Sequence, residues 1–376
     1  MTLAVAAQAM SATGAPAATV SVSVERQPQL LGVAIYSAYP GEENRLEVAA
    51  VDSVIRLRDT GAVIQPGAGC TSVNDHEVLC GAQRARIFLG DRNDAADVPG
   101  PVGLGVAVRG GGGNDLISDG PGHTELAGDD GDDALHAGGG HDVLDGGGGS
   151  DTLVAGPGND RMTDGDLTLG SGVDADVLDG GDGRDAVDYS RRQGPVVVDL
   201  SDPGPDGQAG EGDVLRAVEN AFGGAAGDTL GGDSGRNFFI GNGGDDAMVG
   251  AGGKDRLYGG SGADLALGLS GRDSLSGGTG RDVLDGGDGD DELFGGRSPD
   301  VLFGGRGKDI LGGDEGDDRL DGDSGRDRFF GGSGGDAIDS ADAEREVVNC
   351  GPGRDRARLD RRDSPFRCER LRVRRR

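Results

Sequence analysis

Residues 277–296 read GGTGRDVLDGGDGDDELFGG, and this stretch contains the same pattern twice, nine residues apart. Asp282 and Asp291 each follow a glycine by two residues and precede a leucine by two. A disordered acidic segment could have the same composition, but it has no reason to keep a period. The stretch therefore predicts a repeated structural unit.

The nine-residue period extends far beyond this stretch. Thirteen consecutive frames cover residues 223–339, six cover residues 110–163, and two more, containing Asp176 and Asp185, follow a slip at residues 164–170. Position six is Asp in every frame except those of Thr124 and Asn237, and position eight is apolar throughout the longer block. A register kept over this length is typical of a solenoid.

The composition limits the class of protein. The 376 residues include 78 Gly and no Trp, and the net charge is -31. This is too little apolar mass for an ordinary core of this length. The negative charge argues against nucleic-acid binding, which needs a basic surface, and favours cations as partners. Because no apolar run approaches the roughly 20 residues of a membrane span, we expect no transmembrane segment.

The frame G-G-x-G-x-D-x-apolar-x resembles the RTX, or hemolysin-type, calcium-binding nonapeptide repeat over roughly residues 110–339. The resemblance implies an all-β fold, a right-handed parallel β-roll. In that fold two nonapeptides complete one turn, and Ca2+ ions lie between successive turns on each side.

The residue types support this interpretation independently. Glycine suits tight turns with positive φ and a close approach of the backbone to an ion. Positions seven to nine predict a short strand whose position-eight side chain points inward. If two frames form a turn, aspartates 18 residues apart stack and repel one another, and Asp336 is the last of its row. A hard divalent cation that prefers oxygen ligands reverses that repulsion.

The predicted Ca2+ ligands are therefore the position-six aspartates. They are Asp115, Asp133, Asp142, Asp151, Asp160, Asp176, Asp185, Asp228, Asp246, Asp255, Asp264, Asp273, Asp282, Asp291, Asp300, Asp309, Asp318, Asp327 and Asp336. Individual frames can instead be degenerate turns that hold water rather than metal, and the first candidates for this are the frames of Thr124, of Asn237 and of Ser298 with Pro299.

The four cysteines form two local pairs in the sequence, Cys70 with Cys80 and Cys350 with Cys368. Two local disulfides are the natural pairing and imply an oxidising compartment. Four reduced cysteines are the alternative. Zinc is disfavoured because no Cys-x-x-Cys spacing occurs and His76 is the only histidine near a cysteine.

The sequence divides into six segments. Residues 1–17 resemble a secretory signal, with a plain disordered leader as the alternative. Residues 18–98 alternate apolar and polar side chains and predict a small β-domain that caps the first turn. The first repeat block (110–188), a strand-and-loop insertion (189–222) and the second repeat block (223–339) follow.

Residues 340–376 form the last segment, which carries 11 Arg and 4 acidic residues from Cys350 onward. This end resembles the Cys-flanked tails of actinobacterial repeat proteins, and we expect a basic, disulfide-bearing cap. Binding of an anionic cell-envelope polymer is the alternative role.

No active site is expected in this chain. The serine of GGSGG (331–335) lies at the variable third position of a frame, and no helix is predicted after it, as a nucleophile elbow would require. The four histidines form no H-E-x-x-H motif. We predict a secreted calcium-binding protein with a structural, surface or adhesion role. An accessory calcium-binding module of an extracellular hydrolase is the alternative.

Overall fold

The computed structural model describes residues 18–23, 33–51, 54–67, 70–81, 84–99, 105–165, 174–202 and 204–373. These residues form β-strands and turns and contain no helix. The chain divides into two compact units, Met1–Asp166 with Asp174–Asp185, and Leu167–Val173 with Ala186–Arg376. The signal-like leader expected at residues 1–17 lies outside the described residues.

The first unit begins with hairpins. Antiparallel pairs join β1 (Ala18–Ser23) to β2 (Val33–Ser37), β3 (Arg45–Val51) to β4 (Val54–Asp59), β4 to β7 (Glu77–Cys80), and β7 to β6 (Cys70–Asn74). The short β5 (Ile64–Pro66) pairs in parallel with β1. Cys70 lies opposite Cys80 in the β6–β7 register and forms the predicted disulfide with it.

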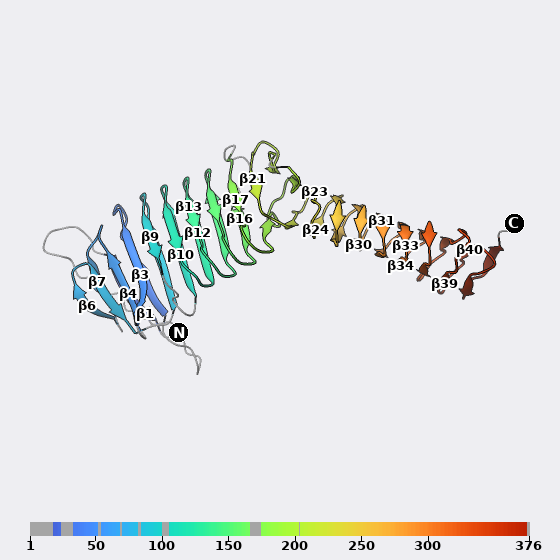
Figure 1. The fold of residues 1–376 in the computed structure, drawn as a ribbon. Helices are drawn as coiled ribbons and strands as arrows, with labels where there is room; N and C mark the ends of the chain where they lie inside the picture. Colours follow the sequence, from blue (N-terminus) through green and yellow to red (C-terminus); the bar gives the residue numbers. More distant parts are fainter. Residues whose placement is uncertain are drawn as a thin grey trace. The chain divides into compact units, whose positions relative to one another are not determined.

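Two parallel ladders make up the rest of the first unit (Figure 1). One consists of β2, β8 (Arg84–Gly90), β10 (Val106–Gly112), β12 (Thr124–Asp130), β14 (Val143–Gly148) and β16 (Arg161–Gly165). The other consists of β3, β9 (Ala95–Val98), β11 (Leu116–Asp119), β13 (Ala134–His136), β15 (Thr152–Val154) and β17 (Val177–Asp179). The chain alternates between the ladders, as a β-roll requires.

The second unit repeats this arrangement. Its first ladder is β18 (Ala186–Asp188), β22 (Asn220–Phe222), β24 (Phe238–Gly243), β27 (Arg256–Ser261), β30 (Ser274–Thr279), β32 (Glu292–Arg297), β34 (Ile310–Glu315), β37 (Arg328–Phe330), β39 (Val347–Asn349) and β41 (Ser364–Phe366).

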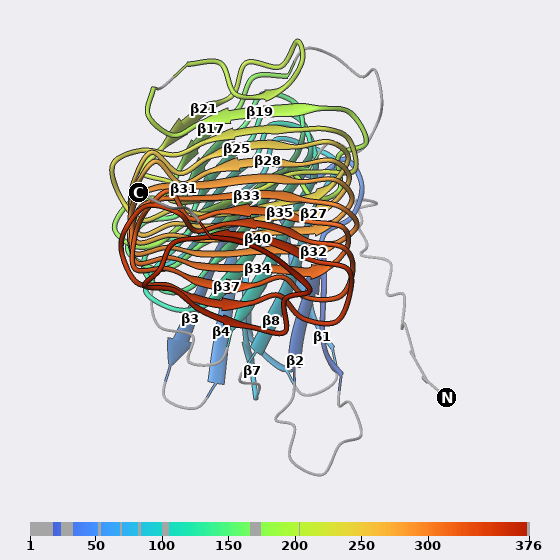
Figure 2. The same cartoon turned by 90° about the vertical axis from the view of Figure 1, so that its right-hand side faces the viewer.

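The second ladder of this unit is β19 (Val196–Asp199), β23 (Thr229–Gly231), β25 (Ala247–Val249), β28 (Leu265–Leu267), β31 (Val283–Gly289), β33 (Val301–Gly307), β35 (Arg319–Asp321), β38 (Ala337–Asp339), β40 (Arg356–Leu359) and β42 (Arg370–Val373). Figure 2 shows β25, β28, β31, β33 and β35 stacked in this order. The small strands β26 (Gly252–Gly253), β29 (Ser270–Gly271) and β36 (Ser324–Gly325) join the same sheet.

The position-eight side chains form the core of each unit, as predicted. Leu284 is fully buried, whereas its neighbour Val283 is 37% exposed. The same burial applies to Ile117, Leu126, Leu135, Leu144, Leu153, Met162, Leu178, Leu230, Phe239, Met248, Leu257, Ala266, Leu275, Leu293, Leu302, Leu311, Leu320, Phe329 and Ile338. Because partners in neighbouring turns are both position-eight residues, such as Leu284 and Leu302, the row of inward side chains is continuous. The all-β parallel β-roll is thereby confirmed.

Glycines make the turns possible. Gly278 and Gly280 have φ of 107° and 133°, a region that residues with a Cβ atom rarely adopt. A methyl group at Gly280 would also collide with the carbonyl oxygen of Gly262 in the neighbouring turn. These turns therefore favour glycine both by conformation and by space, although Asn242 and Ser298 adopt positive φ at the same two repeat positions.

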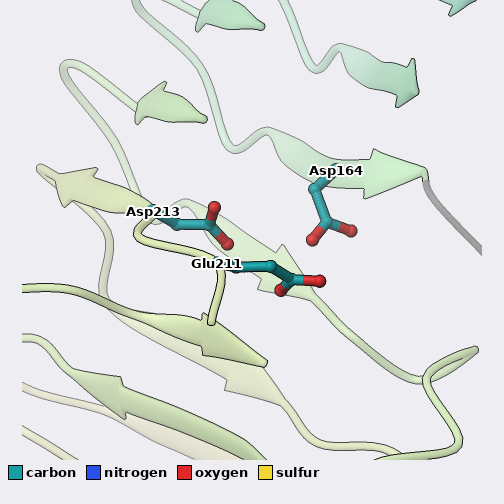
Figure 3. A group of neighbouring side chains, drawn as sticks. All are labelled: Asp164, Glu211 and Asp213. Carbon is teal, nitrogen blue, oxygen red and sulfur yellow. The ribbon is translucent and has the colours of Figure 1, made fainter. Parts of the chain in front are cut away.

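Residues 189–222 leave the nine-residue period without leaving the roll. The strand-like PVVVDLS contains β19, and β20 (Gly207–Gln208) pairs with it antiparallel. The loop between β20 and β21 (Val214–Arg216) carries two carboxylates (Figure 3). Glu211 forms a buried ion pair with Arg192 at 3.2 Å, and Asp213 accepts a hydrogen bond from the Tyr189 hydroxyl at 2.9 Å. These two acids therefore have protein partners.

The C-terminal segment continues both ladders through β39, β40, β41 and β42. The second predicted disulfide, Cys350–Cys368, is present as well. It joins the residue after β39 to the segment between β41 and β42.

Candidate metal-binding edges

The position-six aspartates stack along two edges of the second unit. The backbone N–H of Asp264 donates to Oδ1 of Asp282 at 2.9 Å, and that of Asp282 donates to Oδ1 of Asp300 at 2.9 Å. One edge contains Asp228, Asp246, Asp264, Asp282, Asp300, Asp318 and Asp336. The other contains Asn237, Asp255, Asp273, Asp291, Asp309 and Asp327. The predicted 18-residue stacking is thus confirmed.

The first unit has the same edges. Asp115, Asp133 and Asp151 are linked by N–H to Oδ1 hydrogen bonds of 2.7 Å. The slip near residue 164 does not interrupt the edges, because Asp151 donates to Asp176 and Asp160 donates to Asp185 across 25 residues. The two isolated frames are therefore in register with the block before them.

In most of the repeat frames the second carboxylate oxygen has no hydrogen-bond partner, whereas Oδ2 of Asp228 accepts from the N–H of Gly224 at 2.5 Å. In the repeat frames Oδ2 is buried and accepts no hydrogen bond in Asp115, Asp133, Asp142, Asp151, Asp160, Asp246, Asp255, Asp264, Asp273, Asp282, Asp291, Asp300, Asp309, Asp318 and Asp336. These side chains are at most 3% exposed. A buried, unpaired carboxylate oxygen is costly unless a cation compensates its charge.

The position-one glycine provides room beside this oxygen. A methyl group at Gly286 would lie 2.6 Å from Oδ2 of Asp291 and 2.7 Å from the carbonyl oxygen of Gly304. A carboxylate oxygen and a carbonyl oxygen of the next turn therefore flank one small space. Ca2+ prefers ligands of this kind and tolerates irregular geometry, so these residues fit the metal that the sequence predicts.

Burial makes the edges electrostatically unfavourable without a cation. Burial, together with the charges of the neighbouring aspartates of the same edge, raises the pKa of Asp291, Asp300 and Asp309 to about 7. The backbone hydrogen bond to Oδ1 opposes this shift. Near neutral pH the stacked carboxylates can carry their full charge only if something positive lies between them.

The expected degenerate frames differ from one another. The N–H of Asn237 donates to Asp255 at 2.8 Å, but its own amide accepts from the N–H of Asp233 and donates to the carbonyl of Glu219. The hydroxyl of Thr124 donates to Asp119. In the frame of Ser298 and Pro299, however, Asp300 keeps both hydrogen bonds of its edge. That frame is regular in geometry.

In each unit an edge continues past the residues that the nine-residue period predicts. Asp94 donates to Oδ1 of Asp115 at 2.7 Å, Asp336 donates to Asp355 at 3.0 Å, and Asp355 donates to Oε2 of Glu369 at 2.9 Å. Asp336 is therefore not the last of its row, which corrects the expectation. The stretches GDRND (90–94) and CGPGRD (350–355) resemble the start of a repeat frame and could have indicated these edge residues. Asp355 does not fit the nine-residue period, because segment 340–349 is one residue longer than a frame.

The motif GGSGG does not lie in the strand-to-helix turn of a nucleophile elbow. Ser333 of GGSGG lies between β37 and β38, so a strand follows it rather than the helix of a nucleophile elbow. None of the described residues belongs to a helix with the length and hydrophobicity that a bilayer crossing requires.

Comparison with known families agrees with the geometry. The family model of the RTX calcium-binding nonapeptide repeat (four copies) matches residues 127–162 and, in overlapping stretches, 222–257, 231–266, 258–293, 267–302, 285–320 and 303–338. No curated protein matches the chain. The fold and the edges define a parallel β-roll with acidic edges. Residues 127–162 and 222–338 therefore contain RTX-type calcium-binding nonapeptide repeats.

Proposed function

We propose that this protein is a secreted structural β-roll without catalytic activity. It folds around Ca2+ ions shared between the aspartates of stacked turns and serves at a cell surface or in adhesion. The nineteen position-six aspartates named from the sequence are its ligands, together with turn carbonyls. The single observation that supports this most is the row of buried Oδ2 atoms without a hydrogen-bond partner.

The folding requirement is tested by circular dichroism of the full chain during a Ca2+ titration after EDTA treatment. We expect the β signal to rise with a midpoint of about 0.1–1 mM, the range of extracellular calcium modules. Mg2+ is the matched control, because it demands near-octahedral geometry and keeps its water, so it should be a poor substitute. A β signal unchanged by EDTA would refute the proposal.

The two disulfides support export to an oxidising compartment. A peptide map under non-reducing conditions, made from protein recovered outside the producing cells, should contain the Cys70–Cys80 and Cys350–Cys368 pairs. Protein found only inside the cells, with four free thiols, would overturn this part of the proposal.

The C-terminal arginines support contact with an anionic cell-envelope polymer. Arg354, Arg356, Arg361, Arg367 and Arg370 are exposed. Counterion release would make such binding weaken steeply with salt. Cosedimentation with purified cell envelopes at low and high salt tests it, and binding that salt does not change would exclude an electrostatic contact.

A further inference from the structure

A further group of carboxylates lies in the C-terminal segment, beyond the last nonapeptide frame. Glu346 directly precedes β39, whose Val347 pairs with Arg328 of β37. Glu346 therefore takes the place that follows Asp327 on its edge. The matched repeats end at residue 338, and the segment 340–349 is not a nonapeptide frame.

Glu346 is buried without a partner. Its side chain is 1% exposed, and neither Oε1 nor Oε2 has a hydrogen-bond partner. It thus differs from the aspartates of the edge, whose Oδ1 accepts the backbone N–H of the preceding turn. Both oxygens of Glu346 remain available to a ligand.

Two other carboxylates converge on this side chain. One ligand oxygen from each of Asp342, Glu346 and Asp360 lies within 4.8 Å of the others. Among the described residues, no ion pair with Lys or Arg is formed by any of the three. No cationic side chain among the described residues therefore compensates their charge.

The surrounding hydrogen bonds hold the two aspartates in place. Asp342 accepts from the N–H of Gly325 at 3.0 Å and from that of Glu344 at 2.8 Å. Asp360 accepts from the N–H of Arg362 at 2.6 Å. Asp363 links the two segments, because its Oδ2 accepts from the N–H of Asp360 and from the Ser340 hydroxyl.

The electrostatics of this group agree with its geometry. Burial raises the pKa of Glu346 to about 9, and the neighbouring Asp363, Asp342 and Asp360 add to the shift. Three converging carboxylates with oxygen-only ligands favour a hard divalent cation such as Ca2+ over a transition metal.

We propose that Asp342, Glu346 and Asp360 form a separate Ca2+ site that fastens segments 340–346 and 359–363 to each other and to the end of the roll. Each ligand comes from an irregular segment rather than from a glycine-rich frame. The site therefore goes beyond the proposed function of the repeats.

The test uses the full chain and two measurements, equilibrium dialysis with radioactive Ca2+ and hydrogen–deuterium exchange by mass spectrometry. Glu346→Gln and Asp360→Asn each remove one ligand charge with little change in shape. We expect each variant to bind one ion fewer per chain. Exchange protection by Ca2+ should disappear within residues 340–363 and persist within residues 255–330.

Glu344→Gln is the matched control, because Glu344 lies two residues from Glu346 but is exposed. It should behave like the unmodified chain. Persisting protection within residues 255–330 shows that a variant has folded, and Asp360→Asn replaces Glu346→Gln if the latter does not fold. Unchanged stoichiometry and protection in both variants would overturn the proposal.

The two proposals fail in different ways. If Ca2+ protects residues 255–330 but not residues 340–363 of the unmodified chain, only the Ca2+ site of Asp342, Glu346 and Asp360 is refuted. If Ca2+ protects residues 340–363 alone, the calcium-dependent roll is refuted, and the Ca2+ site of Asp342, Glu346 and Asp360 is supported.

Discussion

The two oxygens of a position-six carboxylate have different environments. Oδ1 of Asp282 accepts the N–H of Asp264, whereas Oδ2 is buried without a partner. An asparagine amide could replace the first oxygen but not the charge on the second. Asn237 shows that this residue is compatible with the edge, since it keeps the hydrogen bond to Asp255.

We therefore expect Asp282→Asn to raise the Ca2+ midpoint without destabilising the calcium-free chain. A loss of about 1.4 kcal/mol in binding corresponds to a tenfold weaker affinity, and we expect a change of this order for the affected ions. Calorimetric Ca2+ titration measures it. Asp285→Asn, which removes the same charge at position nine, is the control, and an equal effect of both variants would mean that bulk charge controls binding.

The adjacent glycines Gly148 and Gly149 differ in whether the structure has room for a side chain. Gly149 has a φ of 128°, and a methyl group there would collide with the carbonyl oxygen of Gly131. Gly148, at the variable third position, has nothing within 4 Å of an added methyl group and no positive φ.

Gly149→Ala should therefore lower the free energy of unfolding by more than about 1 kcal/mol, since a strained conformation and a steric clash combine. Gly148→Ala should be neutral or slightly stabilising, because it restricts the unfolded chain. Thermal unfolding in saturating Ca2+ compares the two. Similar melting temperatures for both variants would contradict the turn geometry described above.

At the scale of the element, each strand contributes little to the core. In β31 Leu284 is fully buried, between Ala266 of β28 and Leu302 of β33. With one such side chain per frame, the strands depend on their neighbours in the ladder more than on their own burial. A defect in an interior strand should therefore affect the turns on both sides.

Leu284→Ala should destabilise the Ca2+-loaded roll by about 2–5 kcal/mol, the usual cost of such a cavity. It should also broaden the unfolding transition, because repeats on either side lose their common neighbour. Val283→Ala is the control, since Val283 is 37% exposed, and its effect should be well below that of Leu284→Ala. Urea unfolding followed by circular dichroism measures both.

At the scale of the whole molecule, the sequence predicts the contacts that follow from the nine-residue period, but it does not predict the edge residues that lie where the period is interrupted. The pairing of Asp282 with Asp300 and the inward position of Leu284 follow directly from the nine-residue spacing. Asp355 and Glu346 could not be found in this way, because segment 340–349 has one extra residue. Only the backbone pairing of β39 and β40 shows that the edges continue there.

The same edges determine how the whole chain responds to pH. An aspartate has a pKa of about 3.9 in an unfolded chain, whereas burial raises the pKa of Asp264 to about 6 and that of Asp291 and Asp318 to about 7. Between these values the folded, calcium-free state binds more protons than the unfolded state. Its stability is therefore complete below pH 4 and is lost as the pH rises through 7.

Ca2+ reverses this dependence, because it binds only the deprotonated carboxylates. In EDTA we expect more β structure at pH 5 than at pH 8, and in Ca2+ a midpoint that falls to lower concentration as the pH rises over the same range. Circular dichroism across this pH range, with and without Ca2+, measures both trends in one preparation. A calcium-free chain that gains β structure as the pH rises would show that the buried carboxylates do not limit folding, and the role proposed for the edges would then be wrong.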